Sequence, residues 1–191
     1  LKAINGEIGM QSRHMSFANY PLFMENQAIG GYGVRHWISA SGGATILGIN
    51  LNHKDPVLRR IFGDSRFRKA LSHAIDRDAL NEASFFGIGQ PRQVAPPPSS
   101  AYYHETYENA FIAYDADEAN SLLDMMGLVR SKPDGIRIRP DGLPLEVSIE
   151  TTAMNSRTLE LIAGYWSEVG KDPSQGIGAA VVLPAQSRID A

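Results

Sequence analysis

The clearest pattern along the chain is a stripe of apolar residues that recurs every three or four positions between residues 65 and 75. This spacing places the stripe on one face of an α-helix, with polar residues on the opposite face. Asp64 stands directly before the stripe, where an N-cap residue is expected. The pattern therefore predicts an amphipathic helix over 65–75 whose buried positions are Phe67, Ala70, Leu71, Ala74 and Ile75.

Three further helices are predicted from the same periodicity and from their end signals. Each begins at a capping residue (Asp76, Asp115 or Asn155) and ends at a glycine. The sequence does not decide whether a further short helix starts at Ser16, because Pro21 is tolerated only in the first turn of a helix. The three helices cover about 76–86, 115–126 and 155–169. The first runs through Ala79, Leu80, Ala83 and Phe86, and the other two have stripes at Ala119, Leu122, Leu123 and Met126 and at Leu159, Ile162, Ala163 and Trp166.

Strands are predicted where β-branched and aliphatic residues alternate or cluster. Residues 34–39 and 44–52 are expected to be strands. Residues 136–139 and 145–151 flank a Pro-Asp-Gly turn, which predicts a hairpin. Because the strand at 145–151 is followed by a helix and then by an apolar run at 179–183, we expect a parallel crossover pair there.

Length and composition fit one ordinary globular domain. The chain has 191 residues, of which 43% are hydrophobic and 20% are charged, enough for a core without disulfides or metals. The fold class that we expect is therefore α/β, a mixed sheet flanked by helices in a single domain over residues 1–191. With 18 basic and 21 acidic residues, the net charge of −3 disfavours a protein that binds nucleic acid.

Few residue types in this chain could hold a cofactor or a covalent intermediate. Cys is absent, which excludes disulfides, thiolate nucleophiles and thiolate metal sites. The five His residues lack the close spacing of a metal site. We therefore expect no metal and no cofactor. No apolar run approaches the roughly 20 residues that a membrane-spanning helix needs.

Several functions stay open from the residues alone, because the motifs of common hydrolases, phosphate loops and zinc enzymes are absent. The loop over residues 151–157 joins the end of a strand to the start of a helix, and it is either a ligand-binding loop or a plain N-cap loop. One alternative is an unfamiliar hydrolase that uses Glu146, Glu150 and Glu160. Another is an interaction domain whose proline-rich loop at 96–98 docks a partner.

One stretch resembles a known family. Residues 64–77, DSRFRKALSHAIDR, are similar to the D-x-R-(V/F)-R-x-A-(L/I)-x-x-A-I-D-R stretch of the family-5 bacterial extracellular solute-binding proteins. Gly9 stands where that family usually has Asp, and residues 171–177 depart from its pattern. Further motifs follow in the family's order: NGEIG at 5–9, GIN at 48–50, GIGQP at 87–91, the YD, LL and G positions of 114–127, DG at 141–142 and WSEVG at 166–170.

The resemblance implies a lobe of the type II periplasmic-binding-protein fold, excised from a longer two-lobed receptor. Such a receptor is not an enzyme. It captures a peptide or an oligosaccharide in the cleft between its lobes and presents it to an ABC permease in the membrane. We expect it to act as a monomer in the periplasm or outside the cell, with lipid anchoring N-terminal to Leu1 as one option.

The same resemblance, with the strand–helix loops, indicates candidate ligand-binding residues. Because the chain holds one lobe and ends before the family's gW-x-x-D segment, we expect it to bind solute weakly by itself. No catalytic residue is expected. The candidates are Gln11, Arg13 and His14 after the opening segment, and Thr151, Thr152, Asn155 and Arg157 between strand and helix.

Overall fold

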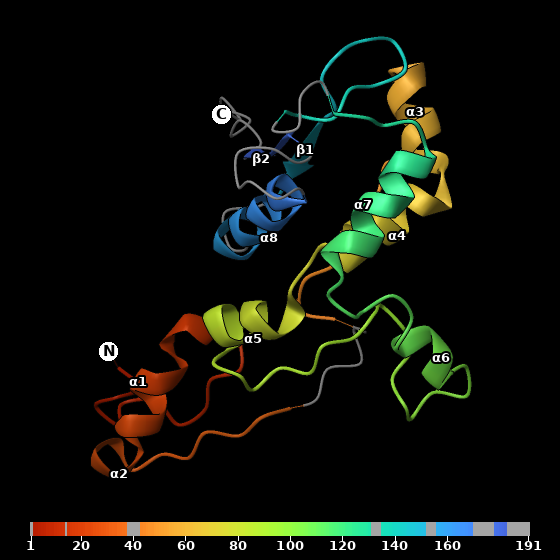
Figure 1. Ribbon diagram of the computed structural model, residues 1–191. Coiled ribbons are helices and arrows are strands. Elements are labelled where there is room, and N and C mark those ends of the chain that lie inside the picture. The colour runs from red at the N-terminus through yellow and green to blue at the C-terminus, as the bar shows by residue number, and fades with distance from the viewer. Residues whose placement is uncertain are drawn as a thin grey trace, which may run out of the picture.

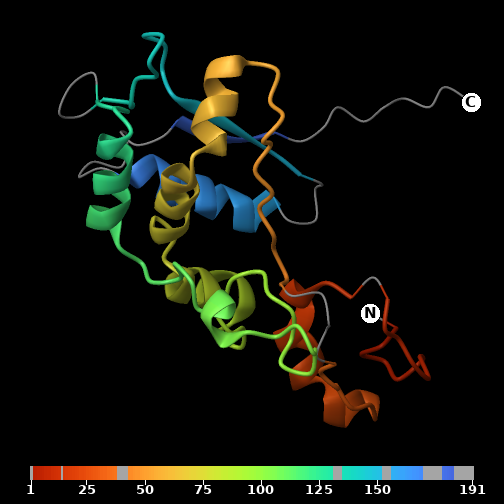
Figure 2. The same ribbon diagram turned by 90° about the vertical axis from the view of Figure 1, so that its right-hand side faces the viewer.

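The computed structural model describes residues 2–13, 15–37, 43–130, 135–151, 156–169 and 178–182. Its elements, in chain order, are η1 (Phe17–Asn19, a 3-10 helix), α1 (Tyr20–Glu25), α2 (Gln27–Gly30), α3 (Pro56–Gly63), α4 (Ser65–His73), α5 (Arg77–Phe85), α6 (Glu105–Glu108), α7 (Ala116–Met125), β1 (Glu146–Glu150), α8 (Ser156–Glu168) and β2 (Gly178–Val182). The strands lie at one end with α3, α4, α7 and α8, and the other helices form the opposite end (Figures 1 and 2). The chain is thus a mixed α/β lobe, as the sequence predicts.

Helix α4 confirms the predicted stripe. The Asp64 carboxylate accepts a hydrogen bond from the Arg66 backbone amide at 2.8 Å, as an N-cap residue does. The helix ends at His73, two residues before the predicted end, because Asp76 already caps the next helix. None of the five predicted positions, Phe67, Ala70, Leu71, Ala74 and Ile75, is more than 6% exposed.

Helices α5 and α7 also begin at the predicted caps. Asp76 accepts a hydrogen bond from the Ala79 amide at 2.9 Å, and Asp115 accepts one from the Glu118 amide at 2.8 Å. Helix α7 buries Ala119, Leu122 and Leu123 of the predicted stripe, while Met126, directly after the helix, is half-buried. No residue of α5 is fully buried, but Leu80 is half-buried and packs against the hydrophobic core. The main contacts of α5 with other elements are to α8 and η1.

The segment from β1 to β2 confirms the predicted parallel crossover. The two strands pair in parallel, in register from Glu146 with Gly178 to Glu150 with Val182. Helix α8 connects them and packs against β2. Its stripe of Leu159, Ile162, Ala163 and Trp166 is buried. This unit therefore has the strand–helix–strand order that a right-handed crossover uses.

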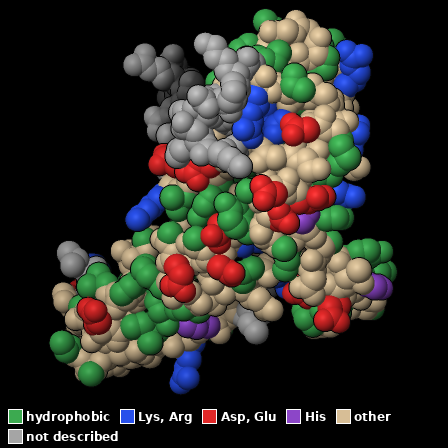
Figure 3. Space-filling model, in the orientation of Figure 1, with side chains coloured by type: hydrophobic (Ala, Val, Ile, Leu, Met, Phe, Trp, Pro, Cys, Tyr) green, Lys and Arg blue, Asp and Glu red, His purple; other side chains and the backbone are tan. Residues whose placement is uncertain are grey.

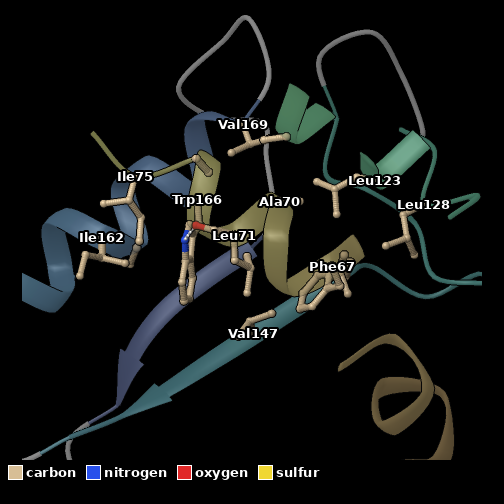
Figure 4. Close-up of a cluster of buried hydrophobic side chains, with 14 of the residues drawn as sticks. Phe67, Ala70, Leu71, Ile75, Leu123, Leu128, Val147, Ile162, Trp166 and Val169 are labelled. Carbon is tan, nitrogen blue, oxygen red and sulfur yellow. Dashed lines mark hydrogen bonds between the residues drawn. The ribbon is translucent and has the colours of Figure 1, made fainter. Parts of the chain in front are cut away.

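One hydrophobic core joins α3, α4, α7, α8 and β1. Trp166 lies at its centre and donates a hydrogen bond from its indole nitrogen to the Leu71 carbonyl at 3.0 Å (Figure 4). Phe62 of α3 stacks on Phe67 of α4 with ring centroids 5.6 Å apart. Val147 of β1 points toward this cluster from below the helices (Figure 4). The sheet and the helices are therefore held by shared side-chain packing.

Two predicted strands do not form in the described part of the chain. Residues 34–37 have no strand partner, and the Val34 amide instead donates to the side-chain oxygen of Gln27 at 2.9 Å. Residues 38–42 lie outside the described residues. Residues 44–45 form a bend, residues 46–50 belong to no sheet, and residues 51–52 form a turn. Both strand predictions failed because a strand needs a neighbouring strand to pair with, and the alternation of residues within one segment does not supply it.

The predicted hairpin is present only as a tight turn with one bridge across it, and a second bridge ties its first arm to Arg130. Gly142 has the positive φ of 84° that glycine tolerates, and the Arg139 amide donates to the Leu143 carbonyl at 2.8 Å across the turn. The bridges join Arg130 with Arg137 and Ile138 with Pro144. Strand β1 then pairs with β2 rather than with the first arm of the hairpin.

Helix α3 is the main element that the sequence analysis missed. The Asp55 carboxylate accepts hydrogen bonds from the amides of Val57 at 2.7 Å and Leu58 at 3.2 Å. Pro56 occupies the first turn, where a missing N–H costs nothing. An Asp-Pro pair before two apolar residues was the available signal. The short helix α6 was missed as well.

The first part of the chain packs as an aromatic cluster against α5. The short helix predicted from Ser16 forms as η1 and α1, although the Ser16 side chain makes no capping bond, and Pro21 lies in the first turn. The rings of Phe17 and Tyr20 stack with their centroids 5.3 Å apart, and the Phe17 centroid lies 6.0 Å from that of Phe85 at the end of α5.

In the described residues, no helix has the length and the apolar run needed to cross a membrane.

Candidate functional site

A groove of about 1060 Å³ opens beside α4, and we call it the α4 groove. Its walls come from α4, α5 and α8 and from two irregular segments, at 43–49 and within 89–111. These elements can be followed in Figure 2. The volume is slightly above the range of about 300–1,000 Å³ for pockets that bind small ligands.

The floor of the α4 groove is apolar and rigidly packed. Leu71, Ile75, Ile162 and Trp166 line it, and each is at most 6% exposed. They belong to the hydrophobic core, so the floor cannot shift without disturbing the packing. At the rim, Val94 is 57% exposed. A ligand with apolar side chains could therefore bury them against a preformed surface.

Ser72 is the centre of a hydrogen-bond network on one wall of the α4 groove. Its hydroxyl accepts from the Arg77 guanidinium and from the Gln93 side-chain amide, each at 2.8 Å, and it lies 2.7 Å from the Phe111 carbonyl, to which it donates. Arg77 also donates to the carbonyls of Ser72 and Ile112. Burial lowers the pKa of Arg77 below its usual value. The network ties α4 to the loop segment that forms the opposite wall.

A second network fixes the proline-rich segment of the same wall. Arg92 forms an ion pair with Glu108 at 3.1 Å and donates to the carbonyl of Ala95 at 3.1 Å. The Tyr103 hydroxyl donates to Glu108 at 2.6 Å. This hydrogen bond to a carboxylate, followed by burial, raises the pKa of Tyr103. Glu108 is only 7% exposed, so the pairing satisfies a charge that would be costly to bury alone.

The polar groups of the α4 groove are arranged for binding. The Ser72 hydroxyl lies between a guanidinium and an amide, and neither can take up its proton as a general base. In the described residues, no three His, Asp or Glu side chains gather as a metal site would require. The arrangement therefore supplies apolar contact and hydrogen bonds, the features of a ligand pocket.

A smaller groove of about 640 Å³ separates β1 from residues 45–54, and we call it the β1 groove. Leu58, Phe62, Leu159 and Trp166 line its apolar side. Trp166 also lines the α4 groove, so the two grooves meet over the same part of the core.

The structure separates the candidate ligand-binding residues into three groups. Thr151 lines the β1 groove, and Arg157 is exposed next to Thr158, which lines the α4 groove. Gln11 and Arg13 are exposed and line neither groove. His14, Thr152 and Asn155 lie outside the described residues. These assignments stay predictions.

The sequence analysis did not select the residues of the two networks. These networks join residues that are far apart in the sequence. Ser72 contacts Gln93 and Phe111, up to 39 positions away, and Glu108 pairs with Arg92. The available signal was indirect, since Ser72 and Arg77 lie inside the 64–77 stretch that carries the family resemblance. Nothing in that stretch indicates which loop would face it.

Comparison with known proteins identifies the family. Residues 3–175 match the model of the bacterial extracellular solute-binding proteins, family 5, middle region. A probable ABC transporter-binding protein of Deinococcus radiodurans is 24% identical over 149 residues, which are 77% of this chain and 24% of that protein. The dipeptide-binding protein of Escherichia coli is 27% identical over 114 residues, 60% of this chain and 20% of that protein.

Solved structures agree with this match. An oligopeptide-binding protein, OppA, superposes with a TM-score of 0.78 and 39% identity, covering 97% of this chain and 29% of that one. The chain thus spans between a fifth and a third of the relatives that it matches. Its fold is that of a lobe of the type II periplasmic binding proteins. The chain belongs to the bacterial extracellular solute-binding proteins of family 5.

Proposed function

We propose that this chain is one lobe of the solute-capturing subunit of an ABC importer, and that the α4 groove forms one side of its peptide-binding cleft. The apolar floor of the groove, flanked by two fixed hydrogen-bond networks, is the observation that carries the proposal. Family membership and the peptide-binding relatives support it. Residues 1–191 form a single lobe, and the remainder of the polypeptide supplies the other.

A peptide fits this groove better than an oligosaccharide. A peptide presents apolar side chains at intervals, which the floor of Leu71, Ile75 and Ile162 can bury. An oligosaccharide would need many polar partners, and the polar side chains here are already bonded, Ser72 to Arg77 and Glu108 to Tyr103 and Arg92. The two lobes close around the solute by a hinge motion, and the closed form then docks on the permease.

The protein acts by binding, as a monomer, in the periplasm or outside the cell, with lipid anchoring as one way to hold it at the membrane. The hydrolase alternative finds no support in geometry. Glu146 and Glu150 both lie on the exposed side of β1, and Glu160 is exposed on α8. The docking-loop alternative is weakened because Pro97 and Pro98 face the α4 groove.

The test is a thermal-shift screen of the full-length gene product against a mixture of tripeptides, a mixture of pentapeptides and a linear hexasaccharide. A ligand at a hundred times its Kd adds about 2.7 kcal/mol of stability. We expect a rise in Tm with a peptide mixture. A shift with the hexasaccharide alone would contradict a peptide solute.

Two matched variants locate the site once a peptide hit is found. Val94→Lys places a charge at the rim of the α4 groove, and Val129→Lys does the same at a site that is 58% exposed and outside the groove. Val94→Lys should weaken titrated peptide affinity at least tenfold, while Val129→Lys should leave it unchanged. Equal affinities for the two variants would place the solute elsewhere.

A further inference from the structure

The α4 groove carries an excess of positive charge, although the chain as a whole is slightly acidic. Arg92 is neutralised by its ion pair with Glu108, the acidic residue among those that line the groove. The other charged residues of the lining are Arg68, Lys69 and Arg77. Within the described residues, none of these three forms an ion pair. The groove therefore offers cations without matching carboxylates.

Lys69 differs from the two arginines in having no hydrogen-bond acceptor. Arg68 donates to the Phe62 carbonyl, and Arg77 donates to the Ser72 carbonyl, each at 2.8 Å, so both guanidinium groups hold parts of the lobe together. The Lys69 ammonium makes no hydrogen bond to any residue that the structure describes. A lysine ammonium has three N–H donors. All three are thus free to bind a ligand in the groove.

The Lys69 ammonium is nevertheless held at a defined place. Its Nζ atom lies 4.7 Å from the centroid of the Phe111 ring, a cation–π contact. Phe111 has a φ of 55°, which is unusual for a bulky side chain, and the Ser72 hydroxyl donates to its carbonyl at 2.7 Å. The segment between α6 and α7 that carries Phe111 runs past the end of α4 (Figure 1). Backbone strain of this kind concentrates at binding sites.

Helix α4 supplies no counter-charge for Lys69. The positions three and four residues away on the same helix are Ser65, Arg66, Ser72 and His73, and none of them is acidic. An ammonium that is fixed beside an apolar floor, without an anion of its own, favours an anionic group on the ligand. Hydrogen bonds from an ammonium to a carboxylate are about twice as strong as those between neutral groups.

We propose that Lys69 binds an acidic side chain of the peptide in the α4 groove, so that the protein selects peptides that contain Glu or Asp. This inference rests on the proposed function, which places the peptide in that groove. The apolar side chains of the peptide lie on the floor and beside Val94, while one carboxylate accepts hydrogen bonds from the Lys69 ammonium.

The position of Lys69 favours a side chain of the peptide over its C-terminus as the source of the carboxylate. The groove is lined by Ser65 in the first turn of α4 and by Ser72 in the last turn, so it continues to either side of Lys69. A peptide that runs along α4 therefore passes Lys69 with a residue from within its length.

Matched peptide pools test this preference on the full-length gene product. One pool holds pentapeptides of Ala, Leu, Phe and Ser with a single Glu at any position, and the other holds the same peptides with Gln in place of Glu. The rise in Tm with pool concentration gives an apparent Kd for each. We expect the Glu pool to bind about tenfold more tightly, which is the usual effect of a hydrogen bond between charged groups.

Three variants assign the preference to Lys69. Lys69→Met removes the ammonium and keeps an unbranched apolar side chain, and we expect it to bring the ratio of the two apparent Kd values to about one. Lys69→Arg keeps a cation and should retain most of the preference. Lys2→Met, at an exposed position outside the α4 groove, is the control and should keep the wild-type ratio. Because each ratio compares two pools on one variant, a loss of stability does not change it.

The outcomes separate this inference from the proposed function. Equal binding of the two pools by the wild type, or a tenfold ratio that survives in Lys69→Met, would overturn the inference alone. Equal weakening of both pools by Lys69→Met would place the C-terminus of the peptide at Lys69 and would also overturn it. If neither pool raises the Tm, the proposed function fails, and the inference fails with it.

Discussion

Arg137 shows how a single buried cation holds a turn in place. It is 1% exposed, and its guanidinium donates to the Leu128 carbonyl, to the side-chain oxygen of Asn120 at 2.7 Å and to the Asp124 carboxylate. Burial lowers the pKa of Arg137, and Asp124 counteracts this. Within the described residues its Nε atom has no partner. The planar guanidinium of Arg137 thus connects α7 to the segment before β1.

Arg137→Lys should destabilise the fold by about 3 kcal/mol, because a lysine ammonium cannot reach three partners in different directions and would stay buried with its charge poorly paired. Urea unfolding measures the change. The control is Arg59→Lys on the exposed side of α3, which should stay within about 0.5 kcal/mol of wild type. Equal stabilities of the two variants would contradict the role of Arg137.

Two N-cap carboxylates should make the fold sensitive to acid. Hydrogen bonds from the Arg66 side chain and amide lower the pKa of Asp64. Burial acts to raise the pKa of Asp55, but the amides of Leu58 and Val57 and the guanidinium of Arg139 outweigh it, so this pKa is also lowered. Each group therefore adds stability above the unfolded value of about 3.9, which is lost as the pH falls through the lower folded value.

We expect the urea midpoint to fall as the pH drops below about 4. The double variant Asp55→Asn/Asp64→Asn should show a shallower fall, because asparagine caps a helix without ionising. Asp117→Asn, at an exposed position that caps no helix, is the control and should keep the wild-type slope. A double variant with an unchanged slope would rule out these carboxylates as the source.

At the scale of elements, the fold depends on helices that share one core. Helix α4 packs against α7 and α3, and Leu71 of α4 accepts the hydrogen bond from Trp166 of α8. Leu71 and Leu122 are 4% and 7% exposed. The stripe predicted on each helix is thus the surface on which the other elements rest.

Leu71→Ala and Leu122→Ala should each lower the free energy of unfolding by about 2–5 kcal/mol, through lost burial and the cavity left behind. Chemical denaturation checks both variants. Leu143→Ala, at a position that is 55% exposed in the turn before β1, provides the control and should have little effect. A wild-type midpoint for either core variant would refute the assignment of that helix face.

At the scale of the whole molecule, much apolar surface is left uncovered. Hydrophobic side chains gather over α1 and α5 (Figure 3), where Phe17, Leu22 and Phe86 are between 38% and 44% exposed. Such a patch usually marks a surface that another part of a protein covers. The chain spans only a fraction of its relatives, which is consistent with a lobe built to pack against further chain.

The isolated 191-residue chain should bind the solute of the full-length protein about a thousandfold more weakly. A half-cleft leaves one side of the ligand in water, and the loss of about 4 kcal/mol of contact turns micromolar affinity into millimolar affinity. Isothermal titration of both proteins with one peptide measures the ratio. Affinities within tenfold of each other would show that the whole site lies within these residues.

The candidate site could be predicted from the sequence only in outline. The resemblance indicated the family-5 solute-binding proteins, and the family match confirms membership of that family. The residues that line the α4 groove were not predicted, because Ser72 meets Gln93 and Phe111 across 21 and 39 positions of chain. Thr151 and Arg157 were chosen for their place between strand and helix, and the structure puts them at or near a groove.

The sequence by itself determined the helices at Asp64, Asp76 and Asp115, since a cap and an apolar stripe act between residues three or four positions apart. It also determined the crossover from β1 to β2, because the chain direction forces that order. Only the tertiary structure decided which extended segments pair. Residues 44–50 alternate as a strand does, yet a ladder depends on a distant partner, and such a partner is not encoded in their own pattern.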